Sequence, residues 1–338
     1  MTASAAGSWR MPAETAEHDG TWMAWPSSGY TLGDTTAEAD EARATWAAVA
    51  HAVLQFEPVR MVVDPSAVAT ARQWLSRDVE IFEAPLDDAW MRDIGPTFVV
   101  GEQGLGAVDW VFNGWGAQEW ASWENDARVG RLVAEWAGAT LVDSGLVNEG
   151  GGIHVDGAGT VVVTRTVQLD PGRNPAWSAA QVEAELRRTL GVRDVVWLER
   201  GLARDYEEFG TRGHVDMLAV LPEPGTVLVH AQQDEQHPDH VVSAELRRAF
   251  GDGWRIVDLP APQRLQDDEG WVDHNYVNHY VCNGAVVACA FDDPHDAVAR
   301  ALLAEAYPGR EVVAVDARPL FERGGGIHCI TQQQPRVR

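Results

Sequence analysis

The sequence predicts an α/β protein in which one supersecondary unit recurs along the chain. Five stretches with the apolar spacing of helices are each followed by a short run rich in β-branched residues. The approximate helix ends lie 61, 53, 60 and 56 residues apart, at Ser76, Ala137, Leu190, Phe250 and Ala306. A nearly constant period of this kind indicates repeated units.

Each predicted helix ends where its apolar spacing stops at a glycine, a proline or a polar break. The helices and the strands that follow them cover residues 66–77 and 79–85, 125–138 and 140–144, 178–191 and 192–198, 238–251 and 254–260, and 294–309 and 310–317. We expect "TWMAWP" near the N-terminus, a helix over 37–56 and a strand over 59–64 to complete a ring. Neither a linker nor a low-complexity tract interrupts the chain, so one catalytic domain over residues 1–338 is expected.

A polar stretch, often with glycine, follows each predicted strand. If the units surround one axis, these stretches meet at one end of it. Four are of interest: "DDAWMRDIGP" at 87–96, "VNEGGGIHVDG" at 147–157, "GTRGHVDML" at 210–218 and "RGGGIHCITQQQ" at 323–334. The repeated "GGGIH" indicates that two units make the same close approach to a shared centre, since glycine lets the backbone come near.

The composition excludes several classes of protein. All 26 basic residues are arginine, so a Schiff-base lysine, a pyridoxal phosphate anchor and a phosphate-loop lysine are impossible. The formal net charge of −25 disfavours nucleic acid and anionic membranes as partners, whereas a small cation would be attracted. The opening "MTASAAGSWRMPAET" lacks a signal-like apolar run, and nowhere do eighteen apolar residues occur together. We therefore expect a soluble, cytoplasmic protein.

Cys329 is the candidate nucleophile among three cysteines, which are too few for a disulfide framework. It lies between a glycine run and a polar stretch. Cys282 and Cys289 instead lie in the strand-like text "YVCNGAVVACAF", where inert buried thiols are expected. Their spacing also does not match a zinc knuckle, so a structural metal is not expected.

A thiolate nucleophile needs a partner for proton transfer, and His214, His328, His154 and His279 are candidates. His214 is favoured because Asp216 follows two residues later, and in a strand both would face one side. The same alternation would turn His328 to the face opposite Cys329, which favours a structural role for it.

Three acids accompany the thiol: Asp93, Glu149 and Asp216. Alone, Asp93 or Glu149 could simply accept hydrogen bonds from a turn. Together the three would raise the pKa of the thiol, which is unsuitable for a neutral substrate. A guanidinium, however, offers a planar fork of N–H donors that carboxylates accept, and its positive charge favours the thiolate.

With these residues the sequence resembles the agmatine deiminase family of the guanidine-modifying, or pentein, superfamily, which includes bacterial peptidyl-arginine deiminase-like proteins. The matching text runs along nearly the whole chain: "MPAETAEHDGTWMAWP", "AWMRDIGPTFVV", "FNGWG", "NEGGGIHVDGAGT", "RNP", "GHVD", "NYVNHYV" and "GGGIHCITQQQP". The resemblance implies a five-bladed α/β propeller of ββαβ-type units around a pseudo-fivefold axis. It also implies roles for six residues: Cys329 as nucleophile, His214 as general acid and base, Asp93 and Asp216 as the guanidinium clamp, and Glu149 and Trp90 as pocket residues.

The implied reaction is hydrolysis of agmatine to N-carbamoylputrescine and ammonia through an amidino-cysteine, a step of putrescine and polyamine biosynthesis. It needs no cofactor, and its partner is a small cationic guanidine. Arginine, peptidyl-arginine or another alkylguanidine is the alternative substrate. Two further alternatives are a metal-dependent hydrolase built from His214, Asp216, His279 and Cys329, and a non-catalytic cation-binding protein. The sequence leaves open whether the chain forms a homo-oligomer.

The sequence departs from the family pattern at positions that concern the far end of the substrate. Arg165 lies in "TRTVQLDPG", where the family carries acidic residues and a cysteine, and "RDYEEFGTRGHVD" is longer than usual. Gly326 replaces an asparagine of the family, and Arg323 stands where glycine is common. A pocket for arginine should contain a cation for its carboxylate, and Arg165, Arg323 and Arg92 are the candidates.

Overall fold

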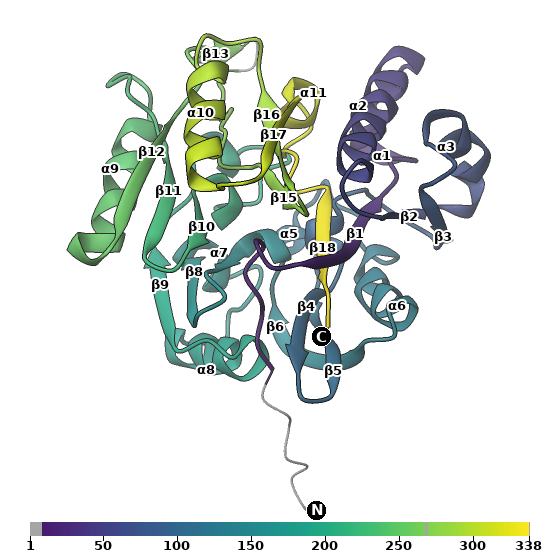
Figure 1. Cartoon of the computed structure of the whole chain (residues 1–338), viewed down its shortest axis with the longest axis horizontal. Coiled ribbons are helices and arrows are strands. Elements are labelled where there is room, and N and C mark those ends of the chain that lie inside the picture. Colours follow the sequence, from purple (N-terminus) through teal and green to yellow (C-terminus); the bar gives the residue numbers. More distant parts are fainter. Residues whose placement is uncertain (1–8, 268–269, 338) are drawn as a thin grey trace, which may run out of the picture.

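In the computed structural model, which describes residues 9–267 and 270–337, five α/β units follow one another in chain order around a common centre (Figure 1). The first unit contains β1 (His18–Ala24), α2 (Thr36–Leu54), β2 (Val59–Val63), α3 (Val68–Trp74), β3 (Glu80–Glu83) and the C-terminal strand β18 (Thr331–Pro335). The second contains β4 (Thr97–Gly101), β5 (Gly104–Val111), α6 (Val129–Trp136) and β6 (Thr140–Val147).

The other three units have the same order of elements. The third has β7 (Ile153–Val155), β8 (Thr160–Thr164), α8 (Ala179–Leu190) and β9 (Asp194–Leu198). The fourth has β10 (Ala219–Glu223), β11 (Thr226–Ala231), α9 (Asp239–Phe250) and β12 (Arg255–Pro260). The fifth has β15 (Tyr280–Cys282), β16 (Ala285–Ala290), α10 (Asp296–Ala306) and β17 (Glu311–Asp316). Besides short 3-10 helices, the described residues also form α1 (Gly29–Leu32), α4 (Met91–Ile94), α5 (Gly114–Ala117), α7 (Arg165–Gln168), α11 (Arg318–Phe321), β13 (Gln266–Asp267) and β14 (Gly270–Trp271).

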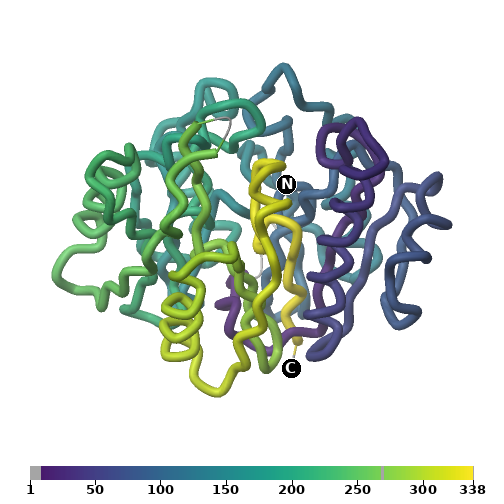
Figure 2. Tube along the Cα trace, turned by 90° about the horizontal axis from the view of Figure 1, so that it is seen from above, coloured from purple at the N-terminus to yellow at the C-terminus, as the bar shows by residue number. Residues whose placement is uncertain are grey.

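Strand pairing confirms the predicted ββαβ units. In the second unit β4 pairs with β5 antiparallel, and β5 pairs with β6 parallel after the α6 crossover. The third, fourth and fifth sheets repeat this pattern. In the first unit β18 takes the place of the leading strand and pairs antiparallel with β1. The C-terminal segment therefore closes the ring, and Figure 2 shows it in yellow between the green fifth unit and the purple N-terminal one.

The first unit is larger than the sequence indicated. Each of the five predicted helix–strand pairs falls in a different unit, but the pair at 66–85 shares its sheet with β1 and β2, because β3 adds to that sheet beside β2. The helix of the first unit is α2, which begins in a capping box between Thr35 and Glu38. Since α3 connects β2 to β3 and these two strands pair parallel, this helix and β3 extend an existing sheet rather than start a new one.

Candidate active site

The predicted site residues lie where one unit passes into the next, and the structure brings them together in the interior. Trp90 and Asp93 lie between β3 and β4, Glu149 between β6 and β7, His214 and Asp216 between β9 and β10, and Cys329 between β17 and β18. All six side chains are buried. The expected convergence of the polar segments is therefore confirmed.

Glycine makes this convergence possible at two positions. A Cβ on Gly151 would lie 2.5 Å from His214 Nδ1 and 3.0 Å from the nearest carboxylate oxygens of Asp93 and Asp216. A Cβ on Gly325 would lie 2.6 Å from the Trp90 ring and 3.2 Å from Cys329 Cβ. In each "GGGIH" segment a glycine thus brings the backbone into contact with side chains of the site, and a larger residue there would displace those side chains.

His214 lies between two acids. Its Nε2 is 3.2 Å from Glu149 Oε2, and its Nδ1 is 3.8 Å from Asp93 Oδ1. Nδ1 is buried and has no hydrogen-bond partner among residues 9–267 and 270–337. Burial disfavours the charged imidazolium, but the carboxylates of Asp93, Glu149 and Asp216 outweigh it and raise the pKa of His214 to about 9. His214 is therefore set to carry a proton at neutral pH.

Arg173 holds Glu149 in place. The guanidinium Nε donates to Glu149 Oε1 at 3.0 Å, and Nη1 donates to Asp170 at 2.8 Å. Burial opposes ionisation of Glu149, but the charges of Arg173 and His214 prevail and lower its pKa to about 2. The sequence interpretation gave Arg173 no role, although "RNP" was among its motifs. The Glu149 carboxylate is thus occupied by Arg173 and His214.

Asp93 accepts two hydrogen bonds from neutral donors. Trp115 Nε1 donates to Oδ2 at 2.9 Å, and the backbone N–H of Gly151 donates to Oδ1 at 3.1 Å. Burial raises the pKa of Asp93, the charge of His214 lowers it, and the charges of Asp216 and Glu149 raise it, so that the pKa lies at about 6. Asp93 is therefore a buried carboxylate that a bound cation would stabilise as the anion.

Asp216 is oriented by a chain of buried charged groups. His328 Nδ1 is 2.8 Å from Asp216 Oδ2, and His328 Nε2 is 2.7 Å from Glu14 Oε1. Arg92 in turn lies 3.4 Å from the Glu14 carboxylate. The other carboxylate oxygen of Asp216, Oδ1, is buried, and no described residue forms a hydrogen bond with it.

Two expectations about backbone at the site are wrong. Residues 327–330 form a turn rather than a strand, so His328 does not face away from the site but contacts Asp216. His214 and Asp216 also do not share a strand, because a short 3-10 helix spans Val215–Met217. Alternating side-chain directions apply to extended backbone only.

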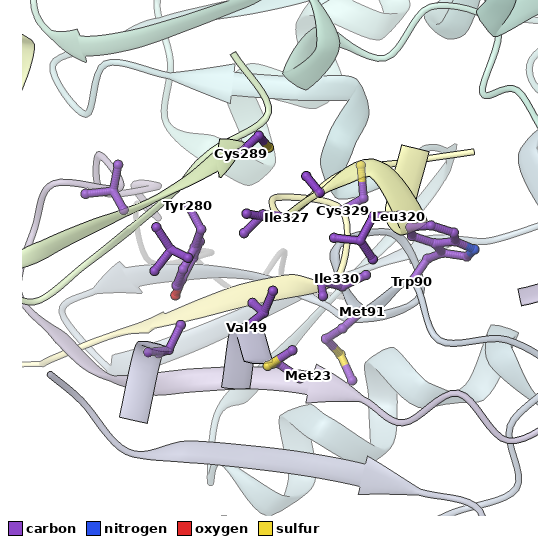
Figure 3. Close-up of a cluster of buried hydrophobic side chains, with 14 of the residues drawn as sticks. Met23, Val49, Trp90, Met91, Tyr280, Cys289, Leu320, Ile327, Cys329 and Ile330 are labelled. Carbon is purple, nitrogen blue, oxygen red and sulfur yellow. The ribbon is translucent and has the colours of Figure 1, made fainter. Parts of the chain in front are cut away.

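Cys329 Sγ lies 3.3 Å from Asn278 Nδ2 and 3.6 Å from Asp216 Oδ2. Burial raises the pKa of this thiol well above its usual range, and the charges of Asp216 and Asp93 raise it further. Gly325 separates Trp90 from Cys329, since a Cβ on this glycine would meet both side chains, and Trp90 donates from Nε1 to the Tyr30 hydroxyl at 2.8 Å. Figure 3 shows Trp90 and Cys329 in one cluster of buried side chains.

The three candidate arginines for a substrate carboxylate are engaged elsewhere. Arg165 lies at the surface, pairs with Glu199 and stacks over Trp197. Arg323 donates to the backbone oxygens of Thr31, Pro319 and Glu38 and pairs with Glu41. Arg92 Nη1 lies 3.4 Å from Glu14 Oε1, while its Nη2 is buried without a hydrogen-bond partner among the described residues.

The metal alternative included His279, whose ring nitrogens instead contact the Tyr276 carbonyl and the Tyr307 hydroxyl. Glu14, His154 and His328 offer potential ligand atoms within 4.8 Å of one another. Both ring nitrogens of His328 already contact carboxylates there, and the cation of Arg92 lies beside Glu14. This group is therefore arranged as an ion-pair network.

In the described part of the chain, no helix is both long and apolar enough to cross a membrane.

Comparisons with known proteins identify the family. The model of the Porphyromonas-type peptidyl-arginine deiminase family matches residues 10–335. A putative agmatine deiminase of Streptomyces coelicolor is 56% identical over 97% of this chain and 99% of its own length. An agmatine deiminase of Stutzerimonas stutzeri is 37% identical over 96% of this chain and 95% of its own. The solved agmatine deiminase of Enterococcus faecalis superimposes with a TM-score of 0.89 at 28% identity, covering 97% of this chain and 96% of that one. The chain thus belongs to the Porphyromonas-type peptidyl-arginine deiminase family and, as its motifs predicted, to the agmatine deiminases.

Proposed function

We propose that this protein is an agmatine deiminase, which hydrolyses the guanidinium of agmatine to N-carbamoylputrescine and ammonia. One observation supports the proposal beyond the likeness to relatives: Asp216 Oδ1 and His214 Nδ1 are buried and find no hydrogen-bond partner in the described part of the chain, and the carboxylate of Asp216 lies beside Cys329. Buried polar atoms without partners are rare, and at a site they mark groups that a ligand completes. A guanidinium supplies the N–H donors that Asp216 requires.

Asp93 and Asp216 are the proposed clamp. Each carboxylate can accept N–H groups of the guanidinium, and burial makes such charge-assisted bonds strong. Cys329 lies close enough to Asp216 for the guanidinium carbon to be presented to the sulfur. The substrate cation also offsets the negative charges that raise the pKa of the thiol.

The reaction then proceeds in two halves. Cys329 Sγ, as the thiolate, attacks the guanidinium carbon, and protonated His214 gives its proton to the nitrogen that departs as ammonia. This leaves an amidino group bonded to sulfur. Neutral His214 next takes a proton from water, whose oxygen attacks the same carbon, and collapse of the adduct releases the ureido product and restores Cys329. Glu149 keeps His214 oriented throughout.

The pairing of the buried arginines favours agmatine over arginine. Arg92 is paired with Glu14, and Arg173 with Glu149 and Asp170. A substrate carboxylate near these acids would be desolvated without a free cation, at a high cost. The amine of agmatine carries no such penalty.

Since residues from all five units surround the site, we also propose that residues 1–338 act as one catalytic domain. The nucleophile requires a free thiol, which favours the reducing cytoplasm as the location of the protein.

The test is a ureido-product assay on a panel of agmatine, arginine, a peptidyl-arginine and a simple alkylguanidine, with ammonia measured in parallel. We expect agmatine to be the preferred substrate and activity to persist in a chelator. Cys329→Ala should abolish turnover while agmatine still binds, since the carboxylates make the main contacts with the cation. Turnover by Cys329→Ala, or preference for arginine, would contradict the proposal.

A further inference from the structure

The segment "RDYEEFGTRGHVD", at 204–216, departs from the family pattern in its length and leads directly into His214. Its backbone is unusual as well. Phe209 and Arg212 have φ angles of +67° and +68°, in the left-handed region that favours glycine. Residues other than glycine keep such a conformation only where the surrounding contacts hold them in it, and they are frequent at functional sites. The contacts that hold this segment therefore bear on what it positions.

Asp205 supplies these contacts. Its carboxylate is buried and accepts three hydrogen bonds: from the N–H of Thr211 at 2.6 Å, from the Thr211 hydroxyl at 2.8 Å and from the N–H of Gly213 at 2.5 Å. The backbone oxygen of Asp205 accepts the N–H of Arg212 at 2.9 Å. One residue thus binds all three residues that precede His214.

Thr211 carries the contact on to His214. Its hydroxyl donates to Asp205 and accepts the backbone N–H of His214 at 3.1 Å, as a hydroxyl can do both at once. The backbone oxygen of Thr211 accepts from Arg173 Nη2 at 2.8 Å, and Arg173 also holds Glu149. Thr211 therefore connects the backbone of His214 with the guanidinium that places the partner of its ring.

The His214 ring depends on this backbone. Among the described residues, Glu149 is the hydrogen-bond partner of Nε2 at 3.2 Å, and Nδ1 has none. A single contact at one end of the imidazole fixes the distance to Glu149 but leaves the tilt of the ring to the main chain. A general acid must present its proton to the departing nitrogen within hydrogen-bond reach, so the place of the main chain affects proton transfer.

We propose that Asp205 and Thr211 are positioning residues, which hold the backbone of His214 so that its ring meets both Glu149 and the substrate. The inference rests on the proposed function. Burial raises the pKa of Asp205, whereas the charge of His214 lowers it, so protonated His214 favours the carboxylate form that accepts these hydrogen bonds.

Two substitutions at Thr211 separate the hydroxyl from the rest of the side chain. Thr211→Val keeps the size and the charge of the site but removes the hydroxyl, whereas Thr211→Ser retains it. Asp205→Asn replaces one acceptor oxygen with an amide nitrogen that only donates. Asp156→Asn is the matched control, because Asp156 Oδ1 also accepts three backbone N–H groups, those of residues 158–160, and none of these bonds involves the site.

The measurements are the kinetics with agmatine and the pKa of His214, followed by NMR of the protein labelled with ¹⁵N-histidine. The His214 signal is assigned by its loss in His214→Asn. We expect Thr211→Val and Asp205→Asn to lower kcat about tenfold to a hundredfold while KM changes less than about threefold, because the clamp on the guanidinium remains. The pKa of His214 should fall by about 0.5–1 unit as the contact with Glu149 loosens.

Thr211→Ser should restore kcat and the pKa of His214 to near the wild-type values, and Asp156→Asn should lower the melting temperature but leave both in place. Normal kcat and an unchanged His214 pKa in Thr211→Val would overturn the inference. Equal losses in Thr211→Ser and Thr211→Val would do so too, since the hydroxyl would then have no role. The NMR titration needs no turnover, so a wild-type protein inactive on all guanidines would contradict the proposed function while the pKa shift still decides the role of Asp205 and Thr211.

Discussion

Replacing Glu149 with glutamine tests how the site keeps His214 protonated. Burial alone would lower the pKa of His214, and nearby carboxylates, Glu149 among them, bring it to about 9. Loss of the charged contact at 3.2 Å removes about 1.5–3 kcal/mol, which equals about one to two pKa units. His214 must hold a proton in the first half-reaction, so activity falls as the pH rises through its pKa. The alkaline limb of kcat/KM should therefore move to lower pH by about one to two units in Glu149→Gln.

The assay is the pH profile of kcat/KM for agmatine, and Asp170→Asn is its matched control. Each of these variants removes one carboxylate partner of Arg173, but Asp170 has no contact with His214. Both variants should lower the melting temperature, whereas only Glu149→Gln should shift the alkaline limb. An equal shift in both, or none in Glu149→Gln, would refute direct control of His214 by Glu149.

Three further predictions follow from the contacts. Asp93→Asn and Asp216→Asn should each cost about 3 kcal/mol or more of transition-state stabilisation, which lowers kcat/KM at least about a hundredfold. A loss under tenfold would mean that the residue only accepts hydrogen bonds from a turn and does not bind the substrate. His328→Asn retains a donor near the position of Nδ1, so its kcat/KM should fall less than that of His328→Ala, in which the Asp216 side chain can rotate. Equal losses of kcat/KM in the two variants, measured per active site by titration, would contradict the positioning of Asp216 by His328. Agmatine should exceed arginine by at least about 4 kcal/mol, roughly a thousandfold in competition assays, and Arg165→Ala should leave that ratio unchanged because Arg165 lies at the surface.

The repeat was predictable because its signals are local. Helical spacing, a following β-branched run and a glycine-bearing end recur within each unit, so the period and the places where Asp93, Glu149, His214 and Cys329 occur could be read along the chain. The role of α3 could not be predicted from the sequence, because whether β3 joins an existing sheet depends on its pairing with β2. Pairing between strands is a tertiary contact, and local periodicity does not determine it.

The groups that orient the site residues were not predictable for the same reason. Glu14, His328 and Asp216 come from distant parts of the chain, and their hydrogen bonds exist only after the ring has closed. A signal for Asn278 was nevertheless present. It lies in "NYVNHYV", at the junction of two units, the same place in the repeat as Cys329. A search by position in the repeat, rather than by residue type, would have found it.

The charges of the site explain why a nucleophilic thiol can work among carboxylates. Three of the site acids have a cationic partner: Glu14 with Arg92, Glu149 with Arg173, and Asp216 with His328. Asp93 accepts hydrogen bonds from two neutral donors and has His214 Nδ1 at the longer distance of 3.8 Å, and its pKa is raised to about 6, with burial as the largest cause. A bound guanidinium would pair with Asp93 and would also lower the pKa of the neighbouring thiol. Because the substrate supplies the cation, the thiolate becomes favourable only when the atom that it must attack is in place.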